Sequence, residues 1–205
     1  MNTEIIPAVL EGAIERALAV LGGGGLVAFP TDTVYGLGAL AFDGPAVESI
    51  YLAKDRPAEK AIPILLADAE DLGKVAAEVP EMARRLAARF WPGPLTLIVP
   101  KLQTLPDAVS ATSTVAVRVP DHLAARTLLR AAGPMAVTSA NISAKPTAST
   151  AGEVFAQLGG RIALILDGGP TPGGISSTLV DCTGAEPKIV RDGPLTRELV
   201  LSALH

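Results

Sequence analysis

The chain has 205 residues, 49% of them hydrophobic and only 3% aromatic, so we expect one domain with an aliphatic core. Its formal net charge of −4 argues against a broad nucleic-acid-binding surface but leaves room for a local basic pocket. One cysteine and two histidines exclude a disulfide framework and argue against a structural zinc site. The first basic residue is Arg16 and no apolar run is of membrane-spanning length, which predicts a cytoplasmic protein with no membrane partner.

Apolar periodicity and turn residues predict helices that alternate with short strands. In the first half of the chain, helices are expected over 11–21, 45–54 and 80–90, and strands over 26–29, 36–41, 62–66 and 95–99. In the second half, helices are expected over 122–132, 151–158 and 196–204, and strands over 114–119, 135–138, 162–166, 178–181 and 188–190. Several strands follow one another directly, so we predict an α/β fold with a mixed parallel and antiparallel sheet and flanking helices.

Residues 30–38 form a polar turn, Pro-Thr-Asp-Thr-Val-Tyr-Gly-Leu-Gly, that directly follows the apolar run 26–29. Ligands bind at the ends of strands in open α/β sheets. Polar groups at the mouth of a buried strand are costly to desolvate unless something binds them. The segment therefore predicts the floor of a small-molecule site.

Several familiar catalytic motifs are missing. The glycine-rich stretches 22–25 and 168–174 lack both the Lys-Ser/Thr of a Walker loop and the Gly-x-Gly-x-x-Gly spacing, so we interpret them as turns. There is no Gly-x-Ser-x-Gly elbow and His122 falls in an expected helix, which makes a hydrolase triad hard to assemble. If the chain is an enzyme, the substrate itself carries the nucleophile.

Basic residues gather at the end of the expected helix 45–54. Lys54 and Arg56, with Lys60 close behind, complement the helix dipole in one interpretation. In the other, the chain extends before Pro57 and residues 54 and 56 point the same way, a pair of cations suited to a polyphosphate.

Other polar clusters also follow strands. Residues 138–143 form either a capping turn or a strand-end site in which Ser139 and Asn141 face one side. Arg118 is either a surface side chain whose stem covers apolar residues or an anion ligand. The same pattern recurs at 176–178 and at Arg191. We therefore predict that these clusters converge on one open face, with Arg56 and Arg118 as exposed pocket residues.

Five ordered motifs resemble the YrdC-like family of L-threonylcarbamoyladenylate synthases. They are residues 30–38, the Lys-x-Arg at 54–56, Trp-Pro-Gly-Pro-Leu-Thr at 91–96, Val-Arg-Val-Pro at 117–120 and the Ser-x-Asn at 139–141. The resemblance covers about residues 10–195 and implies a twisted mixed sheet with one large concave face. It also implies condensation of L-threonine, bicarbonate and ATP to threonylcarbamoyl-AMP with release of pyrophosphate. The product would feed N6-threonylcarbamoyladenosine formation at position 37 of tRNAs that read ANN codons.

The resemblance also implies roles for individual residues. The positions expected to hold threonine are Thr33, Arg118 and Ser177, and those expected around ATP are Arg56, Lys60, Thr114, Ser139, Thr147 and Arg191. The catalytic set implied by the signature pairs is Lys54, Arg56, Ser139 and Asn141. Magnesium that bridges the phosphates is expected, with no ligands named by the sequence.

The chain departs from the family pattern in one strand. Longer members often carry a histidine that contacts threonine where this sequence has Leu65, and Ala61-Ile62 replaces the more usual Pro-Leu. The threonine pocket is therefore expected to be lined differently. The chain resembles the single-domain form over residues 1–205, in which a partner or mobile loops must close the site.

Two other functions stay open. Related domains have been interpreted as platforms for tRNA or double-stranded RNA, but the acidic net charge predicts that any tRNA contact is weak or indirect. A divergent carbamoyl-transfer paralogue would keep the fold and lose the signature pairs, which are intact here. Downstream proteins that transfer threonylcarbamoyl to tRNA are expected as partners from the resemblance alone.

Overall fold

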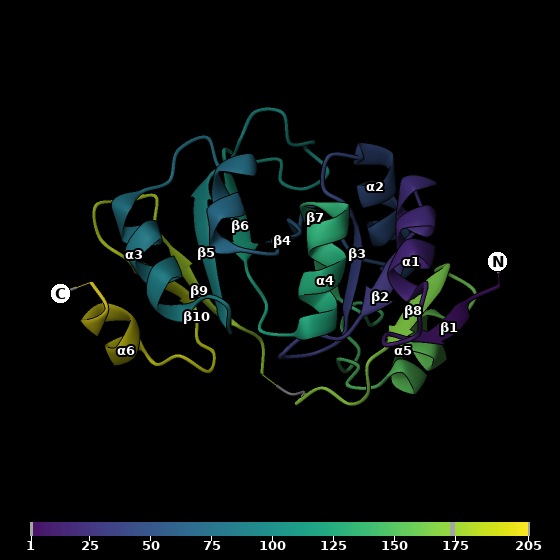
Figure 1. Cartoon of the computed structure of the whole chain (residues 1–205). Coiled ribbons are helices and arrows are strands. Elements are labelled where there is room, and N and C mark those ends of the chain that lie inside the picture. The colour runs from purple at the N-terminus through teal and green to yellow at the C-terminus, as the bar shows by residue number, and fades with distance from the viewer. Residues whose placement is uncertain (1, 173–174, 205) are drawn as a thin grey trace.

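A computed structural model describes residues 2–172 and 175–204 (Figure 1). In these ranges the helices are α1 Ala13–Gly22, α2 Gly44–Lys54, α3 Glu81–Phe90, α4 Leu123–Ala132, α5 Ala151–Leu158 and α6 Arg197–Ser202, with a 3₁₀ helix at Ala69–Lys74. The strands are β1 Glu4–Pro7, β2 Val27–Phe29, β3 Gly36–Leu40, β4 Ile64–Leu65, β5 Leu95–Pro100, β6 Thr114–Arg118, β7 Met135–Ser139, β8 Leu164–Asp167, β9 Thr178–Asp181 and β10 Lys188–Arg191.

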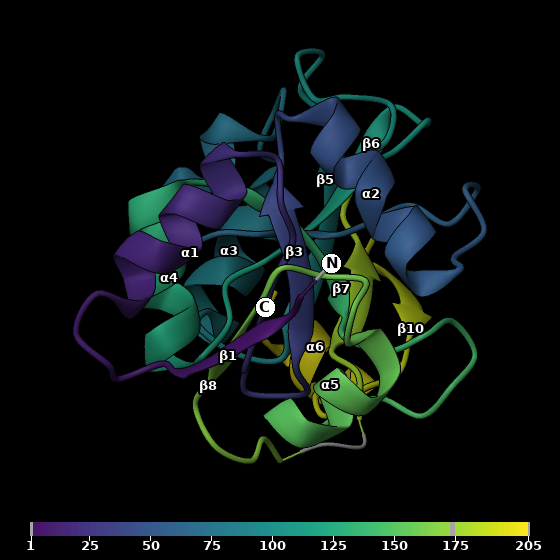
Figure 2. The same ribbon diagram turned by 90° about the vertical axis from the view of Figure 1, so that its right-hand side faces the viewer.

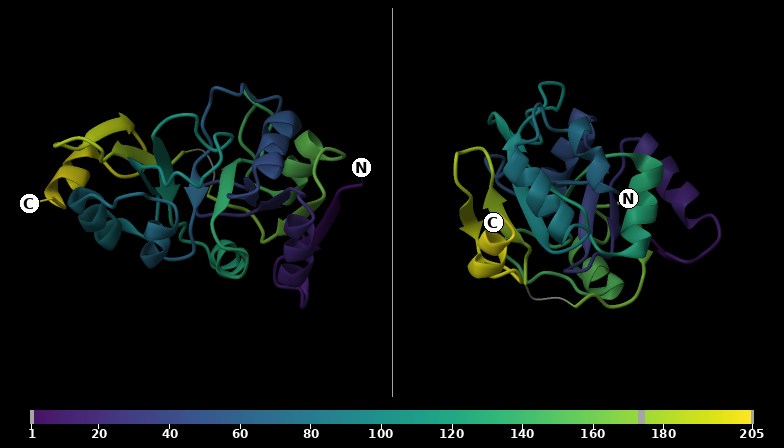
Figure 3. Two further views of the ribbon diagram at one scale, coloured as in Figure 1. Left: turned by 90° about the horizontal axis from the view of Figure 1, so that it is seen from above. Right: turned by 60° about the vertical axis from the view of Figure 1, so that its left-hand side comes forward.

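In the described part of the chain, all ten strands belong to one sheet, ordered β1-β8-β2-β3-β7-β4-β6-β5-β9-β10. The pairs β1–β8, β8–β2, β4–β6 and β5–β9 are parallel, and the other neighbours are antiparallel. The predicted mixed sheet is thus confirmed. Because β1 and β10 are the two edges, the N- and C-terminal regions lie at opposite ends of the molecule (Figure 3).

The predicted elements are found, most with ends shifted by one or two residues, and three differences stand out. Strand β1 and the 3₁₀ helix Ala69–Lys74 were not predicted, and β4 spans two residues instead of the expected 62–66. β1 is held by parallel pairing with β8 and by a 2.6 Å hydrogen bond from the Thr3 hydroxyl to Ile162 O. Both contacts join positions more than 150 residues apart, so local pattern could not reveal them. Pro63 has no N–H to donate, which shortens the ladder of β4.

Helix α2 begins and ends as its sequence predicts. The Asp43 side chain accepts a 3.1 Å hydrogen bond from Ala46 N, and Pro45 lies in the first turn. At the other end Asp55 adopts φ 51°, a left-handed conformation that stops the helix before Arg56. The cap therefore directs the chain away from the helix axis between Lys54 and Arg56.

Alternation along the strands divides the core between the two faces of the sheet. Val27 and Phe29 pack with α1 and α4 on one face, whereas Ala28 belongs to the other core, which α2, α3, α5 and α6 cover. Figure 2 shows α1 and α4 on one side of β3 and α2 and α5 on the other. On the face that α1 and α4 cover, strands β6, β5 and β9 continue beyond α4 and border a cavity.

Within the described residues, none of the helices has both the length and the apolar content that a bilayer crossing requires.

Candidate functional site

The cavity on the sheet has a volume of about 440 Å³ and is lined by side chains from distant parts of the chain. Of the described residues, three arginines reach it: Arg56 after α2, Arg118 at the end of β6 and Arg191 at the end of β10. Hydroxyl groups line it too, from Thr31, Thr33, Thr96, Thr114, Ser139 and Ser177. The predicted convergence of strand-end clusters on one face is confirmed for this set.

Strand periodicity explains why these side chains share a face. In β6, Thr114, Ala116 and Arg118 line the cavity, whereas Val115 and Val117 are buried in the opposite core. In β5, Thr96 lines the cavity while its neighbours are buried. A period of two therefore gives each strand one polar and one apolar face.

Arg118 is held on several sides. Its Nε donates to Gly93 O at 3.0 Å, Nη1 to the Thr33 hydroxyl at 3.1 Å and Nη2 to Asp32 Oδ1 at 2.5 Å. The residue is only 6% exposed, so the prediction of an exposed Arg118 was wrong. The three acceptors lie in the turn after β2 and in the loop before β5, and they hold the side chain in the interior, yet it still borders the cavity.

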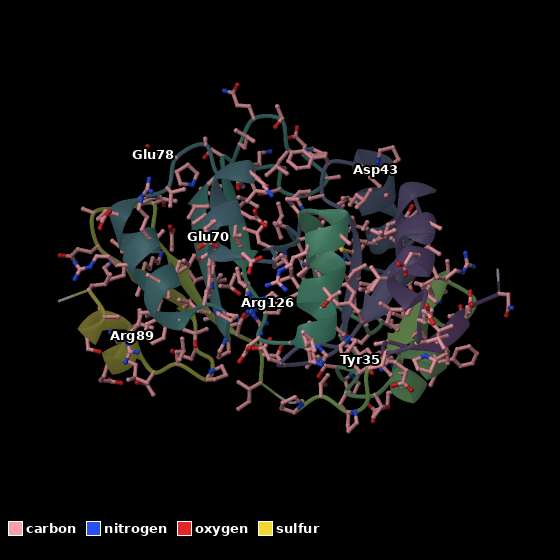
Figure 4. All side chains as sticks on the ribbon, in the orientation of Figure 1. Tyr35, Asp43, Glu70, Glu78, Arg89 and Arg126 are labelled. Atoms are coloured by element: carbon pink, nitrogen blue, oxygen red, sulfur yellow. The ribbon has the colours of Figure 1, made fainter. Side chains whose placement is uncertain are left out.

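The turn 30–36 is built by its own hydroxyls. Thr31 Oγ1 accepts from the backbone N–H groups of Thr33 and Val34 and donates to Val34 O at 2.6 Å. Tyr35, labelled in Figure 4, donates to Gly169 O at 2.8 Å and so ties the turn to the segment after β8. Burial raises the pKa of Tyr35 to about 12, which keeps it a neutral donor.

Arg191 and Ser177 form a second polar cluster in the cavity. The guanidinium donates from Nε and Nη2 to Ser177 O, at 3.1 and 2.9 Å. Ser177 Oγ lies 2.7 Å from Thr96 Oγ1. Partial burial lowers the pKa of Arg191, and repulsion from Arg118 lowers it further. The two guanidinium groups therefore interact electrostatically across the cavity.

Arg56 shapes the loop that follows α2. Its Nε and Nη2 donate to Lys60 O at 3.2 Å and Ala61 O at 2.9 Å. The side chain is half-buried, and this burial lowers its pKa. Removal from water strengthens its interaction with any anion that enters the cavity.

Lys54 does not face the same way as Arg56, so the second interpretation, a pair of cations that point the same way, was wrong. Lys54 is 1% exposed, and its Nζ donates to the carbonyl oxygens of Ser139 and Asn141 instead of lining the cavity. Burial lowers the pKa of Lys54 to about 7, because removal from water disfavours the charged ammonium. The left-handed Asp55 separates the directions of the two side chains.

Asn141 likewise does not face the cavity beside Ser139. Its Nδ2 donates to Ile142 O at 2.8 Å and Lys145 O at 2.9 Å, inside the turn after β7. Ser139 is the member of the pair that lines the cavity. Lys60 and Thr147 are exposed and lie outside the lining.

Sequence reasoning missed some of the lining. Ser110, Thr112 and Thr96 contribute hydroxyls, and Ser110 Oγ lies 3.0 Å from Thr112 Oγ1. The run of hydroxyls at 110, 112 and 114, which leads into the expected strand 114–119, was a readable signal of a polar surface. Gly173 and Gly174, part of the glycine-rich stretch interpreted as a turn, lie outside the described residues.

The donor set is suited to an anion. Guanidinium groups and hydroxyls form the charged and polar parts of the lining, and none of its described members carries a carboxylate. Among residues 2–172 and 175–204, no three His, Cys, Asp or Glu side chains are placed so that they could hold a metal ion together. These residues do not fit a resident metal ion.

Comparison with known proteins gives a consistent result. The family profile Sua5/YciO/YrdC, described as "Telomere recombination", matches residues 19–193. A Bacillus subtilis protein named threonylcarbamoyl-AMP synthase is 45% identical over 193 residues, which cover 91% of this chain and 55% of that protein. A Mycobacterium tuberculosis protein named putative threonylcarbamoyl-AMP synthase is 41% identical over 93% of this chain and 88% of its own.

The fold matches solved structures as well. The crystal structure of Pyrococcus abyssi Sua5 complexed with L-threonine superposes with a TM-score of 0.92 at 42% identity, over 99% of this chain and 60% of that one. The chain thus spans little more than half the length of the B. subtilis and P. abyssi relatives. On this profile match and these identities, the chain belongs to the Sua5/YciO/YrdC family.

Proposed function

We propose that the chain makes L-threonylcarbamoyl-AMP from L-threonine, bicarbonate and ATP and releases pyrophosphate. The observation that carries this proposal is the meeting of Arg56, Arg118 and Arg191 in one hydroxyl-lined cavity. Such a cavity suits a triphosphate beside an amino-acid carboxylate. The names of the B. subtilis and M. tuberculosis relatives, and the L-threonine in the P. abyssi structure, support the same reaction.

The chemistry assigns no nucleophile to the protein. Bicarbonate takes up a proton and loses water to give CO₂. The amine of threonine adds to this CO₂ and releases a proton to give a carbamate, whose oxygen attacks the α-phosphate of ATP while pyrophosphate leaves. Arg118 and Thr33 hold the threonine carboxylate, with Ser177 beside them. Arg56 and Arg191 hold the phosphate oxygens, with Thr114 and Ser139 as neutral donors. The protein aligns the carbamate oxygen with the leaving group and neutralises charge that develops there.

Two of the expected roles take a different form. Lys54 and Asn141 act on the turn after β7 and thereby set the position of Ser139. Magnesium enters as part of the Mg·ATP substrate, because the cavity lining offers no carboxylate to hold it alone.

The wider context follows from the reaction. The product is a labile mixed anhydride, so a transfer protein must deliver it to tRNA as N6-threonylcarbamoyladenosine. We place the reaction in the cytoplasm. We also place it in one domain, since the described lining comes from the strands of one sheet and from the loops beside them.

The test is direct product detection. The purified chain is mixed with Mg·ATP, bicarbonate and each of threonine, serine and alanine, and the adenylate is sought by mass spectrometry alongside pyrophosphate release. We expect adenylate with threonine and less with the other two. Salt-dependent tRNA binding without threonine-dependent pyrophosphate release would overturn the proposal in favour of an RNA-binding module.

A further inference from the structure

Asp32 carries the carboxylate that pairs with an arginine of the cavity. Its Oδ1 accepts from Arg118 Nη2 at 2.5 Å, and the two side chains are only 15% and 8% exposed. Asp32 does not itself line the cavity, whereas Arg118 and the adjacent Thr33 do. Asp32 therefore lies behind Arg118 and not in the path of a ligand.

Three hydrogen bonds fix the orientation of the Arg118 guanidinium group. Gly93 O and Thr33 Oγ1 accept from Nε and Nη1, so each of the three guanidinium nitrogens has an acceptor. Of these acceptors, only Asp32 carries a charge, and charge-assisted bonds are about twice as strong as neutral ones. Two of the five N–H groups remain without an acceptor among the described residues, and the side chain borders the cavity.

Electrostatics adds a second reason for Asp32. Arg191 and Arg118 are close enough for their repulsion to lower the pKa of Arg191. This repulsion disfavours two arginines on one cavity unless an anion lies beside one of them. Asp32 holds Arg118 against that repulsion and leaves the cavity with a net positive charge.

We propose that Asp32 is a positioning residue, which aims the free N–H groups of Arg118 at the carboxylate of the amino-acid substrate. This inference rests on the proposed function and deepens it, because it separates recognition of the amino acid from recognition of the nucleotide. Asp32 touches neither substrate and acts through Arg118.

The test compares Asp32→Asn and Asp32→Ala with the unchanged chain in steady-state kinetics. For Asp32→Ala we expect the KM for threonine to rise about tenfold or more, the value of one lost charged hydrogen bond. The KM for ATP should change less than about twofold, because Arg56 and Arg191 are untouched. Asp32→Asn keeps the shape of the side chain and one acceptor oxygen, so its KM for threonine should lie between those of the unchanged chain and Asp32→Ala.

Asp68→Asn is the matched control. Asp68 also pairs with arginines of another element, Arg126 at 2.5 Å and Arg130 at 2.9 Å, but it lies outside the cavity lining. Arg126 is labelled on α4 in Figure 4. This variant should lose thermal stability without a change in either KM.

A binding measurement keeps the inference testable without turnover. The midpoint temperature of unfolding is measured at increasing concentrations of threonine, and separately of ATP. Asp32→Ala should lose the upward shift caused by threonine and keep the shift caused by ATP. Equal loss of both shifts, or a threonine KM unchanged in Asp32→Ala, overturns the positioning role. An unchanged chain that turns over no threonine and gains no stability from it overturns the proposed function instead, and this inference with it.

Discussion

At the scale of single residues, the decisive property of the site is that its cations differ in burial. Arg118 is 6% exposed and paired with Asp32, whereas Arg56 is half-buried and donates to the backbone carbonyls of Lys60 and Ala61. Removing one partner of a buried ion pair leaves an uncompensated charge, which costs more than losing a bond to an accessible carbonyl. The same substitution should therefore have different structural costs at the two arginines.

Arg56→Ala and Arg118→Ala are both expected to abolish threonylcarbamoyl-AMP formation. Arg118→Ala should also lower the free energy of unfolding by roughly 3 kcal/mol, because Asp32 is left buried and unpaired. Urea denaturation measures this loss. Arg16→Ala, which breaks a surface pair with Glu4, is the control and should cost less than about 1 kcal/mol. Near-normal turnover in either cavity variant would contradict the assignment of the site.

Lys54 should make stability depend on pH. Its pKa is lowered to about 7 in the folded chain from an ordinary value of 10.5. Between these values the unfolded chain carries a proton that the folded chain lacks, so the free energy of unfolding rises with pH. The slope from this residue is at most about 1.4 kcal/mol per pH unit. Below pH 7 the contribution is flat, because both states are protonated.

Lys54→Met should remove that part of the slope. Urea denaturation from about pH 6.5 to about pH 9.5 measures it, because this range begins just below the folded pKa of Lys54 and covers most of the interval up to the ordinary value. Lys60→Met, at an exposed lysine on the adjacent loop, is the control and should leave the profile unchanged. Parallel profiles for Lys54→Met and the unchanged chain would show that Lys54 stays protonated against its two carbonyl acceptors.

At the scale of elements, the far wall of the cavity depends on close backbone contact between β9 and the segment after β10. A Cβ at Gly193 would lie 2.3 Å from Thr178 N and 2.6 Å from the carbonyl carbon of Ser177. These atoms belong to the backbone and cannot move aside as a side chain could. Gly193 thus lets the segment approach Ser177, to which Arg191 is bonded.

Gly193→Ala should separate this segment from β9 and lower the free energy of unfolding by roughly 1–3 kcal/mol, the usual cost of overpacking. It should also raise the KM for ATP, because Arg191 loses its place beside Ser177. Gly184→Ala is the control, since a Cβ there meets only Glu186 O at 3.7 Å. If the two variants have the same free energy of unfolding and the same KM for ATP, close contact at Gly193 does not support the cavity wall.

At the scale of the whole molecule, the cavity joins regions that the sequence separates widely. Its walls come from the turn after β2, from β6 and β5, and from β9 and β10, across most of the sheet order. A ligand that contacts all of these walls binds only the folded chain. Ligand binding must therefore stabilise the fold as a unit.

Mg·ATP at about one hundred times its dissociation constant should raise the free energy of unfolding by about 2.7 kcal/mol. Pyrophosphate should stabilise the chain as well, and Arg191→Ala should weaken both effects. Thermal unfolding with increasing ligand measures the shift. Stabilisation by ATP that survives in Arg56→Ala and Arg191→Ala together would place the nucleotide elsewhere.

Sequence alone determined the type of most elements, the mixed sheet and the motifs of the site. Local sequence is enough to predict these features. Asp43 and Pro45 predict the start of α2, and the alternation from Thr114 to Arg118 predicts a strand with one polar face. Hydrophobic period and capping chemistry act over a few residues, so they can be read without tertiary contacts.

Only the tertiary structure decided which polar residues line the cavity. Lys54 and Arg56 are two positions apart, yet one left-handed residue between them sends the first into the core and the second to the cavity. The pairing of Asp32 with Arg118 and of β1 with β8 joins segments far apart in the chain. Such contacts depend on packing of the whole sheet, because the partner that satisfies a buried polar group is chosen by position in space and not by neighbours in sequence.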